Sequence, residues 1–348
     1  MKLKVLLGIL ISGIFVYLSF RDVNFQEMLV ALKGANYFWL LPVFFFMLTS
    51  HWLRAARWRY FLKPIKDLQP HPCFSALMIG YAANNILPLR LGEFLRAFAI
   101  GKSQNIPKSS AFATIIVERL IDLLSLLVLL ASMVLLYPLP DMIKNSGYLI
   151  FALTVGAIVF LIFLMEKTEA TINLLQKILP AKLFQFVQKV VRAFLQGFVV
   201  LKKSEHYFRI VLYSVLIWAL YAAVVYVSFF AFKLNEEYGL NLLSSVVVLV
   251  IVTIGIMIPS SPGFVGTYHW FCMQSLALYG VPQSEALSFA VISHAMNTIP
   301  YTIIGLVYFW KENLRFSDAV AEKQLVEHEM AEKKFKMQSA KMKVKSEK

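Results

Sequence analysis

Long apolar runs separated by short polar segments dominate the chain, and their lengths predict membrane helices. The predominantly apolar runs cover residues 5–20, 36–55, 111–136, 148–165, 210–232 and 284–310. A helix that crosses the hydrocarbon core of a bilayer needs about 20 consecutive apolar residues. The pattern therefore predicts an all-α polytopic membrane protein with about six full spans.

Two further apolar runs are interrupted by residues that break helices. Asn84, Asn85 and Pro88 divide the run 73–100, and the sequence PSSPGFVG at 259–266 divides the run 242–279. Proline lacks an amide hydrogen and disfavours a helical residue before it. Irregular backbone at membrane depth is tolerated only where it is buried in protein or lines a water-filled cavity. Each run is therefore expected to form a re-entrant or broken helical hairpin, as in a transporter.

The positions of lysine and arginine predict the orientation of these segments. Lys2 and Lys4 precede the first apolar run, while Arg54 and Arg57 follow the second. Cytoplasmic loops of membrane proteins carry an excess of such residues. We therefore expect cytoplasmic N- and C-termini, a first hairpin that enters from the cytoplasm, and a second that enters from outside. This interpretation places Arg54 and Arg57 in a cytoplasmic loop and Trp58 at the membrane interface.

The composition agrees with one membrane domain. Of 348 residues, 59% are hydrophobic and 16% are charged, against about 45–50% and 25% in soluble proteins. We expect residues 1–310 to form this domain, with a cytoplasmic amphipathic insertion at 166–209 and a charged cytoplasmic tail at 311–348. The net charge of +14 is spread between the spans, which favours an anionic membrane surface over nucleic acid. The expected location is the bacterial cytoplasmic (inner) membrane.

Charged residues inside the apolar runs are the first candidates for a functional site. They are Arg90, Glu93 and Arg96 in the first hairpin, and Glu118, Arg119 and Asp122 in the run 111–136. Spacings of three and four residues place each set along one helix face. A charge at the centre of a membrane helix costs about 2.5–3.5 kcal/mol, so these residues need partners. We expect Arg119 to pair with Glu118 or Asp122. Either an ion pair joins the two segments, or the charges contact substrate or a proton; the two roles are compatible.

The interrupted hairpins and the last span supply further candidates. Helices that start after the breaks, near Pro88 and Gly263, would present backbone amides to an anion. Gly263 and Gly266 permit close approach of a ligand, or of a neighbouring helix. His294, Asn297 and Tyr301 form a polar stripe that lines a cavity or is simply buried. Asn84 and Asn85 belong to the same candidate set.

Enzyme signatures are missing from the sequence. Residues 101–103 read Gly-Lys-Ser, but Arg96 occupies the position of the first glycine of a phosphate-binding loop. Metal-ligand spacings of cysteine and histidine are also missing. We therefore expect no catalytic activity, no metal and no cofactor, and the sequence carries no signal for an oligomeric state.

Three motifs and the expected span count together carry a family resemblance. The motifs are NILPLRLGEFLR at 85–96, ERLID at 118–122 and PSSPGFVG at 259–266. With them the chain resembles the lysylphosphatidylglycerol synthase transmembrane-region family, in a stand-alone form without the aminoacyl-transferase domain. The resemblance implies a flippase-like membrane protein whose partners are membrane lipids.

The favoured hypothesis is a lipid translocase that moves a phospholipid or polyprenyl-phosphate headgroup through a polar cavity between the hairpins. Arg90 and Arg96 would neutralise phosphate. Glu93, Glu118 and Asp122 would bind a cationic headgroup, carry a proton, or hold the arginines. The alternative is a membrane-embedded enzyme, or an accessory subunit that works with a lipid-modifying enzyme in lipid modification or glycosylation.

Overall fold

The computed structural model describes residues 2–87, 91–136 and 206–314, with seven isolated positions between 152 and 184. Throughout these residues the regular structure is helical, and none of them is in a strand. The first six elements are α1 (Lys2–Phe20), α2 (Phe25–Gly34), the short η1 (Tyr37–Trp39), α3 (Leu40–Leu62), α4 (Pro70–Ile86) and α5 (Gly92–Gln104). The others are α6 (Lys108–Leu136), α10 (Tyr207–Ala231), α11 (Leu234–Glu237), α12 (Leu242–Met257), η3 (Pro262–Phe264), α13 (Thr267–Ala277) and α14 (Gln283–Lys311).

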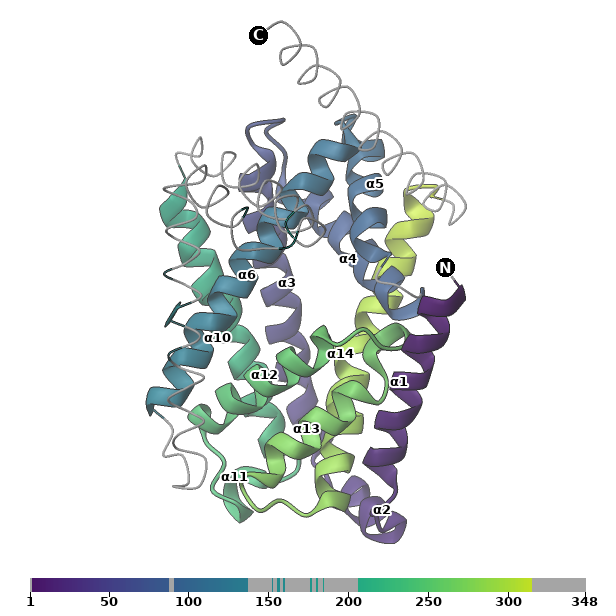
Figure 1. Cartoon of the computed structure of the whole chain (residues 1–348), viewed down its shortest axis with the longest axis vertical. Coiled ribbons are helices and arrows are strands. Elements are labelled where there is room, and N and C mark those ends of the chain that lie inside the picture. The colour runs from purple at the N-terminus through teal and green to yellow at the C-terminus, as the bar shows by residue number, and fades with distance from the viewer. Residues whose placement is uncertain are drawn as a thin grey trace, which may run out of the picture.

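Both predicted breaks are confirmed, and each separates a pair of short helices. The helices α4 and α5 pack together in the upper half of the molecule, whereas α12 and α13 pack together in the lower half (Figure 1). The turn η3 between α12 and α13 contacts α4. The long helix α14 contacts α4 and α13, and thus joins the two hairpins.

The described helices identify an integral membrane protein. Among the described residues, three helical segments are long and apolar enough to cross a membrane: Tyr37–Leu62, Tyr207–Ala231 and Gln283–Lys311. The bent pair α1 and α2 would make a fourth. The expected span at 148–165, the insertion at 166–209 and the tail at 311–348 lie almost wholly outside the described residues, so the six-span count stays a prediction.

Between the first two apolar runs, residues Phe25–Gly34 form the helix α2. Its axis is bent by 84° from α1. The Asn24 side chain accepts hydrogen bonds from the backbone amides of Gln26 and Glu27, which satisfies amides that a helix start leaves unpaired. The bend turns α2 toward α14, which it contacts.

The structure corrects the sequence analysis at the end of α3. This helix continues to Leu62 rather than ending near Ala55. Arg54 and Arg57 are therefore not in a cytoplasmic loop, since both are buried inside the bundle. Trp58 is not an interfacial anchor, because it is 0% exposed. The basic residues interrupt the apolar pattern because they face partners on α6 rather than water.

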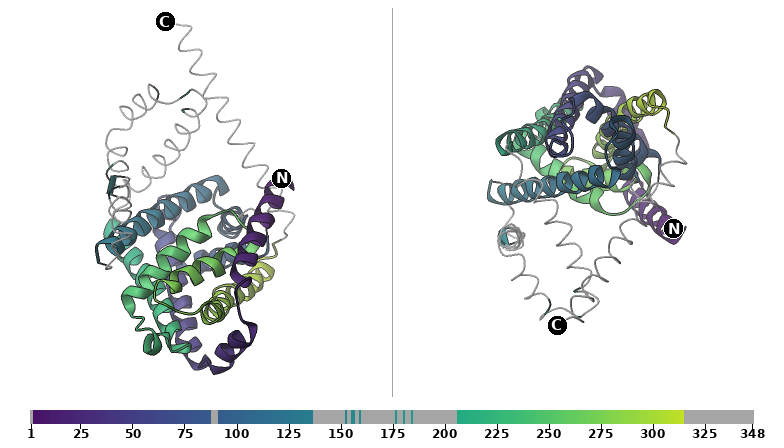
Figure 2. Two further views of the ribbon diagram at one scale, coloured as in Figure 1. Left: turned by 60° about the horizontal axis from the view of Figure 1, so that its bottom comes forward. Right: turned by 90° about the horizontal axis from the view of Figure 1, so that it is seen from above.

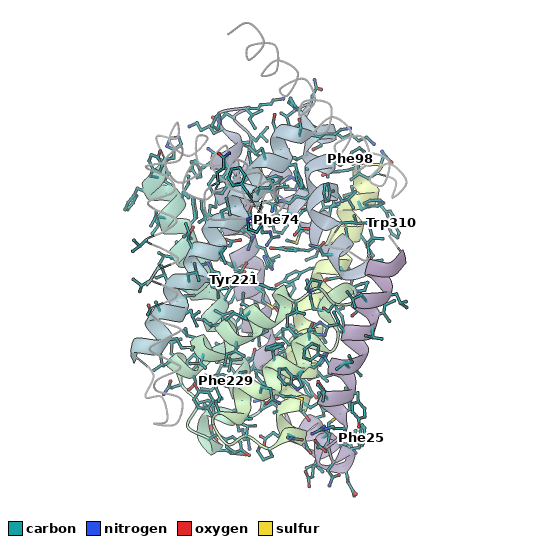
Figure 3. All side chains as sticks on the ribbon, viewed as in Figure 1. Phe25, Phe74, Phe98, Tyr221, Phe229 and Trp310 are labelled. Carbon is teal, nitrogen blue, oxygen red and sulfur yellow. The ribbon has the colours of Figure 1, made fainter. Side chains whose placement is uncertain are left out.

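The two larger apolar cores of the described residues surround the two hairpins. Phe74 and Phe98 belong to the upper core, built mainly from α3 to α6, and Phe229 belongs to the lower core, built mainly from α10, α12, α13 and α14 (Figure 3). The helix α6 lies across one side of the bundle (Figure 2). Burial of apolar surface stabilises both cores by roughly 25 cal/mol per Å². Polar side chains of α3, α5 and α6 meet beside the upper core.

Candidate functional site

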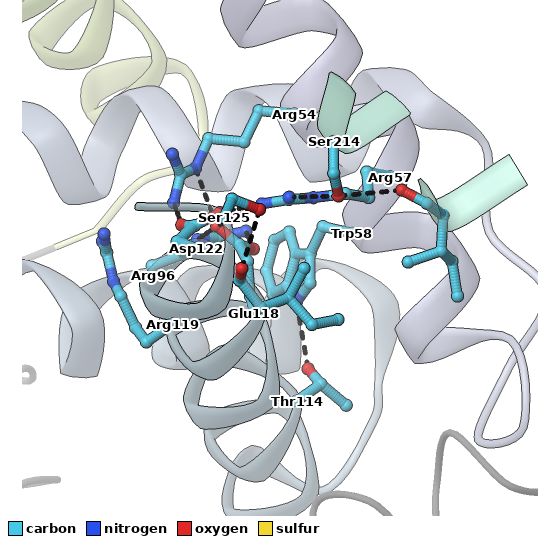
Figure 4. Close-up of polar contacts among 12 residues, drawn as sticks. Arg54, Arg57, Trp58, Arg96, Thr114, Glu118, Arg119, Asp122, Ser125 and Ser214 are labelled. Atoms are coloured by element: carbon cyan, nitrogen blue, oxygen red, sulfur yellow. Dashed lines mark hydrogen bonds and ion pairs between the residues drawn. The ribbon is translucent and has the colours of Figure 1, made fainter. Parts of the chain in front are cut away.

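Five charged side chains form a buried ionic cluster between α3, α5 and α6 (Figure 4). Arg54 donates from Nε to Glu118 Oε1 at 2.7 Å and also bonds Asp122. Arg57 Nη2 lies 2.6 Å from Asp122 Oδ1, and Arg96 Nη2 lies 2.6 Å from Glu118 Oε2. Glu118 is 0% exposed. The two carboxylates of α6 therefore hold three arginines from two other helices.

Helical spacing explains how each element presents its charges. Arg54 and Arg57 are three residues apart on α3, and Glu118 and Asp122 are four apart on α6. Side chains three or four residues apart lie on the same face of a helix. Because α3 and α5 both pack against α6, every charge in the cluster meets an opposite one.

The cluster holds one more positive than negative charge. Arg54, Arg57 and Arg96 contribute three guanidinium groups, which stay protonated in proteins, against the carboxylates of Glu118 and Asp122. The Nε atoms of Arg57 and Arg96 are buried and have no hydrogen-bond partner among the described residues. A buried donor left unpaired is costly. The net charge and the two unused N–H groups both suit an anion such as phosphate.

Trp58 supports the arginine of the first hairpin. The guanidinium carbon of Arg96 lies 3.7 Å from the centre of the Trp58 ring, which is a close cation–π contact. The indole Nε1 of Trp58 donates to Thr114 Oγ1 at 3.0 Å. This bond fixes the ring against α6. Trp58 therefore supports the face of the Arg96 guanidinium, while Glu118 binds its nitrogen atoms.

The helix α10 completes the polar surroundings. Arg57 Nη1 donates to Ser214 Oγ at 2.8 Å, and Arg54 Nη1 donates to the Tyr221 hydroxyl at 3.1 Å. Both arginines are thereby tied to α10 as well as to α6. The site is thus a rigid network whose donors are already oriented.

Glu93 and Arg119 form a separate pair at the edge of the cluster. Arg119 Nη2 lies 3.2 Å from Glu93 Oε1, and the two side chains are 22% (Glu93) and 43% (Arg119) exposed. Arg119 was expected to pair with Glu118 or Asp122, and this expectation is wrong. Arg119 follows Glu118 directly on α6, so its side chain leaves the helix in a different direction and is 43% exposed, whereas Glu118 is 0% exposed.

The two asparagines of the first hairpin have structural partners. Asn84 Oδ1 accepts from the backbone amide of Gly92 at 2.8 Å and so caps the start of α5. Asn85 Nδ2 donates to Thr302 Oγ1 at 2.9 Å on α14. The start of α5 is therefore partly satisfied from within the protein. Arg90, predicted beside it, lies outside the described residues.

The tip of the second hairpin is anchored by α14 and α1. His294 Nε2 lies 2.7 Å from the carbonyl oxygen of Gly263. Gly263 and Gly266 have φ angles of +67° and +87°, in the region that favours glycine. A Cβ on Gly266 would lie 2.6 Å from Ser12 O. These glycines thus serve close packing against α1 and a left-handed turn.

The predicted polar stripe of α14 divides between three environments. His294 serves the second hairpin, while Asn297 Nδ2 donates to the Ser293 carbonyl at 2.8 Å. Tyr301 packs edge-on against His51 of α3, with 4.3 Å between the ring centres. His51 Nδ1 is buried without a hydrogen-bond partner among the described residues. The three residues of the stripe therefore have separate partners, and a cavity role for them stays a prediction.

The structure brings some of the predicted residues together and adds others. Arg96, Glu118 and Asp122 share the ionic cluster, with Glu93 and Arg119 at its edge, whereas the hairpin tips and the α14 stripe lie at other contacts. Sequence reasoning missed five residues: His51, Arg54, Arg57, Trp58 and Tyr221. One feature of the sequence could have indicated the two arginines: the two acidic residues in the run 111–136 need more than one buried cation. Among the described residues, no group of three or more histidine, cysteine or acidic side chains is placed to hold a metal.

Fold and site together define a class: an all-helical integral membrane protein with two oppositely placed helical hairpins and a buried arginine–carboxylate cluster. The chain belongs to the family described as the lysylphosphatidylglycerol synthase TM region, whose model matches residues 5–305. That match confirms the resemblance drawn from the three sequence motifs.

Individual relatives are distant and come from archaea. The chain is 22% identical to Glycosyltransferase AglD of Haloferax volcanii, over 96% of this chain and 59% of that protein. It is also 22% identical to a UPF0104 membrane protein of Methanocaldococcus jannaschii, over 88% of this chain and 95% of the relative. A UPF0104 membrane protein of Methanothermobacter thermautotrophicus is 25% identical over 73% of this chain and 79% of the relative. No solved structure matches the chain.

Proposed function

We propose that this protein is a lipid translocase that moves a phosphate-bearing headgroup past the buried ionic cluster. The observation that carries the proposal is the excess of one arginine in that cluster, together with the unpartnered Nε atoms of Arg57 and Arg96 among the described residues. A lipid phosphate would supply the missing negative charge and accept from both donors.

The arrangement of helices supports movement rather than storage of a lipid. Paired, interrupted apolar segments of opposite sense are typical of transporters, whose binding sites lie near the membrane midplane. Here α5 supplies Arg96 to the cluster, and α5 begins at the break of the first hairpin. A shift of this hairpin would therefore move one arginine relative to the other two.

The proposed substrates are phospholipids and polyprenyl phosphates, since both present a phosphate on an apolar anchor. No bond of the lipid is broken in this proposal, so the protein would act without catalysis and its partners would be membrane lipids. We place it in a cytoplasmic membrane with both termini inside, on the lysine and arginine bias. The named relatives are archaeal, so a bacterial source stays a prediction from the sequence.

A second function is favoured by one specific observation. The relative Glycosyltransferase AglD carries that activity in its name, and this chain spans 59% of its length. The chain could accordingly serve lipid glycosylation, either as an accessory subunit or as a membrane-embedded enzyme. In that case the arginines would hold a lipid phosphate in place for a partner enzyme.

Leaflet exchange of labelled lipids in proteoliposomes tests the proposal. We expect exchange above that of protein-free liposomes for at least one class among anionic phospholipids, zwitterionic phospholipids and polyprenyl phosphates. Exchange no faster than that of empty liposomes for all three classes would reject the translocase and leave the glycosylation role.

A further inference from the structure

Two histidines meet at the tip of the second hairpin, away from the ionic cluster. His269 lies in the first turn of α13 and His294 lies near the middle of α14, with 4.7 Å between their ring centres. Both side chains are buried. Each bonds a backbone group that can only donate or only accept, so the position of each ring proton follows from the partner.

The partner of His269 fixes its protonation state. The backbone amide of Gly266 donates to His269 Nδ1 at 3.3 Å. An amide N–H can only donate, so Nδ1 must be bare and the ring proton lies on Nε2. A second proton would have to bind Nδ1, where it would break this bond and leave the amide at the start of α13 unpaired. The hairpin tip in this form therefore requires a neutral His269.

The partner of His294 imposes the opposite condition. Nε2 of His294 lies 2.7 Å from the Gly263 carbonyl oxygen, and a carbonyl can only accept, so Nε2 carries a proton and donates. The other ring nitrogen can take up a second proton without loss of this bond, which would then be charge-assisted and about twice as strong. The Tyr268 ring lies 4.9 Å from the His294 ring at an angle of 33°, so its face can support an imidazolium.

The groups beside the pair leave room for one added proton. Two imidazolium rings at this separation would repel each other in a buried site, so the pair should take up one proton rather than two. The other titratable groups of α13 at this place are Tyr268, whose ring is near that of His269, and Cys272. Neither is an acid that ionises near neutral pH.

The elements that reach the tip bring no charged side chain to it among the described residues. The helices α12 and α4 and the turn η3 contain no aspartate, glutamate, lysine or arginine. The helix α4 presents Asn85 beside Gly263. The helix α1 bonds the tip through Ser12, whereas its lysines, Lys2 and Lys4, come at least eight residues earlier.

Charged and titratable groups elsewhere along α14 are further from His294. The helix α2 meets α14 at Ser288, and α3 meets it through the contact of His51 with Tyr301. These positions lie six residues before and seven residues after His294, which is more than one helical turn. Glu285, on α14 itself, is nine residues before it. The choice between the two histidines therefore rests on their backbone partners.

We propose that His269 and His294 form a proton-binding site at the tip of the second hairpin, in which His294 takes up the proton and His269 stays neutral. The bound proton strengthens the bond from His294 to Gly263 and so ties the tip more firmly to α14. His269 holds the start of α13 in both states. This site goes beyond the proposed translocase function and does not rest on it.

Side-chain nitrogen NMR of the full chain with labelled histidines tests the protonation states. As the pH falls from about 9 to about 4, a range that spans histidine titration, His294 should gain a proton on Nδ1. His269 should keep its single proton on Nε2. The signals are assigned with His269→Gln and His294→Gln. Uptake of the proton by His269 first, or no titration of either ring in this range, would overturn the site.

Hydrogen exchange of the backbone amides at the tip measures the effect of the proton. After correction for the intrinsic pH dependence of exchange, residues 264–266 should be on the order of tenfold better protected with His294 protonated, because a charged hydrogen bond replaces a neutral one. Weaker protection at low pH would contradict the proposal, since that is the result of a proton on His269. This measurement on the parent protein decides the matter even where a variant fails to fold.

Two variants assign the pH dependence to His294. His294→Gln keeps an N–H donor for the Gly263 carbonyl but does not titrate, so protection of the tip should no longer change with pH. The control is His71→Gln, which removes an exposed histidine of α4 that bonds Tyr308 and should keep the pH dependence of the parent protein. The same pH dependence in His294→Gln as in the parent would overturn the site.

Discussion

Glu118 is the residue on which the geometry of the ionic cluster depends. Its two oxygens accept from Arg54 and Arg96, which come from different helices, and it is 0% exposed. The net charge of the cluster is already positive by one. Loss of this carboxylate would leave three buried arginines against Asp122 alone, so Glu118 is more important for folding than any exposed charge nearby.

Glu118→Gln should therefore destabilise the protein by about 3–5 kcal/mol, the usual cost of removing one partner from a buried ion pair. Thermal unfolding in detergent measures it. Glu93→Gln is the control: its pair is partly exposed and should contribute about 1 kcal/mol or less. Unfolding of Glu118→Gln at the temperature of the parent protein would contradict this account of the cluster.

The stabilities of variants at Arg119 and Arg96 offer a second comparison. Because Arg119 bonds Glu93 and not the buried acids, Arg119→Ala should unfold within a few degrees of the parent protein. Arg96→Ala should unfold much earlier, since it removes two hydrogen bonds from Glu118 and the cation over Trp58. If Arg119→Ala were the less stable variant, the assignment of partners would be wrong.

Among the elements, the hairpin of α4 and α5 depends on two glycines. A Cβ on Gly92 would collide with the carbonyl oxygen of Gly80, and one on Gly80 would lie 2.9 Å from the carbonyl oxygen of Gly92. Asn84 caps α5 across the same contact. The close approach of the two helices fixes the position of Arg96, one turn further along α5.

Gly92→Ala should force α4 and α5 apart at a cost of about 1–3 kcal/mol, the range of overpacking in a tight core. Melting temperature and leaflet exchange should both fall, because Arg96 moves with α5. Gly13→Ala in α1 is the matched control, since a Cβ there meets nothing within 4 Å. Equal stability of the two variants would show that the hairpin tolerates separation.

For the whole molecule, the important feature is that the two hairpins meet on α14. Asn85 at the first tip donates a hydrogen bond to Thr302 of α14. The Gly263 carbonyl at the second tip accepts one from His294, which is also on α14. The hairpins occupy opposite halves of the bundle (Figure 1). One long helix thus contacts both tips.

The opposite placement of the hairpins predicts which loops face each side of the membrane. A cysteine at Ser103, just before the end of α5, should react with an impermeant thiol reagent from the cytoplasm. A cysteine at Glu237, at the end of α11, should react from outside. Both positions are exposed. Labelling of the two from the same side would contradict the topology inferred from the basic residues.

The sequence predicted the breaks in both hairpins and the charged face of α6, but not the complete ionic cluster. The breaks could be predicted because proline and glycine within an apolar run destabilise a continuous helix. The charged face could be predicted because Glu118 and Asp122 had to find cations. Arg54 and Arg57 were missed because basic residues after an apolar run are typical of cytoplasmic loops. Only the packing of α3 against α6 reveals that they lie inside the bundle.

The central claim is that the extra buried arginine binds a lipid phosphate, and Arg57→Gln tests it most directly. This change leaves two arginines against two carboxylates, so the cluster becomes neutral. Asp122 keeps Arg54 as a partner, and the variant should therefore stay folded. Arg59→Gln, on the same helix but outside the cluster, 27% exposed and 3.8 Å from Asp67, is the control. Leaflet exchange of the transported lipid is measured for both, with the melting temperature recorded. We expect exchange to fall at least about tenfold in Arg57→Gln, equal to roughly 1.4 kcal/mol, and to stay at the parent rate in Arg59→Gln. Folded Arg57→Gln that exchanges lipid at the parent rate would contradict the claim.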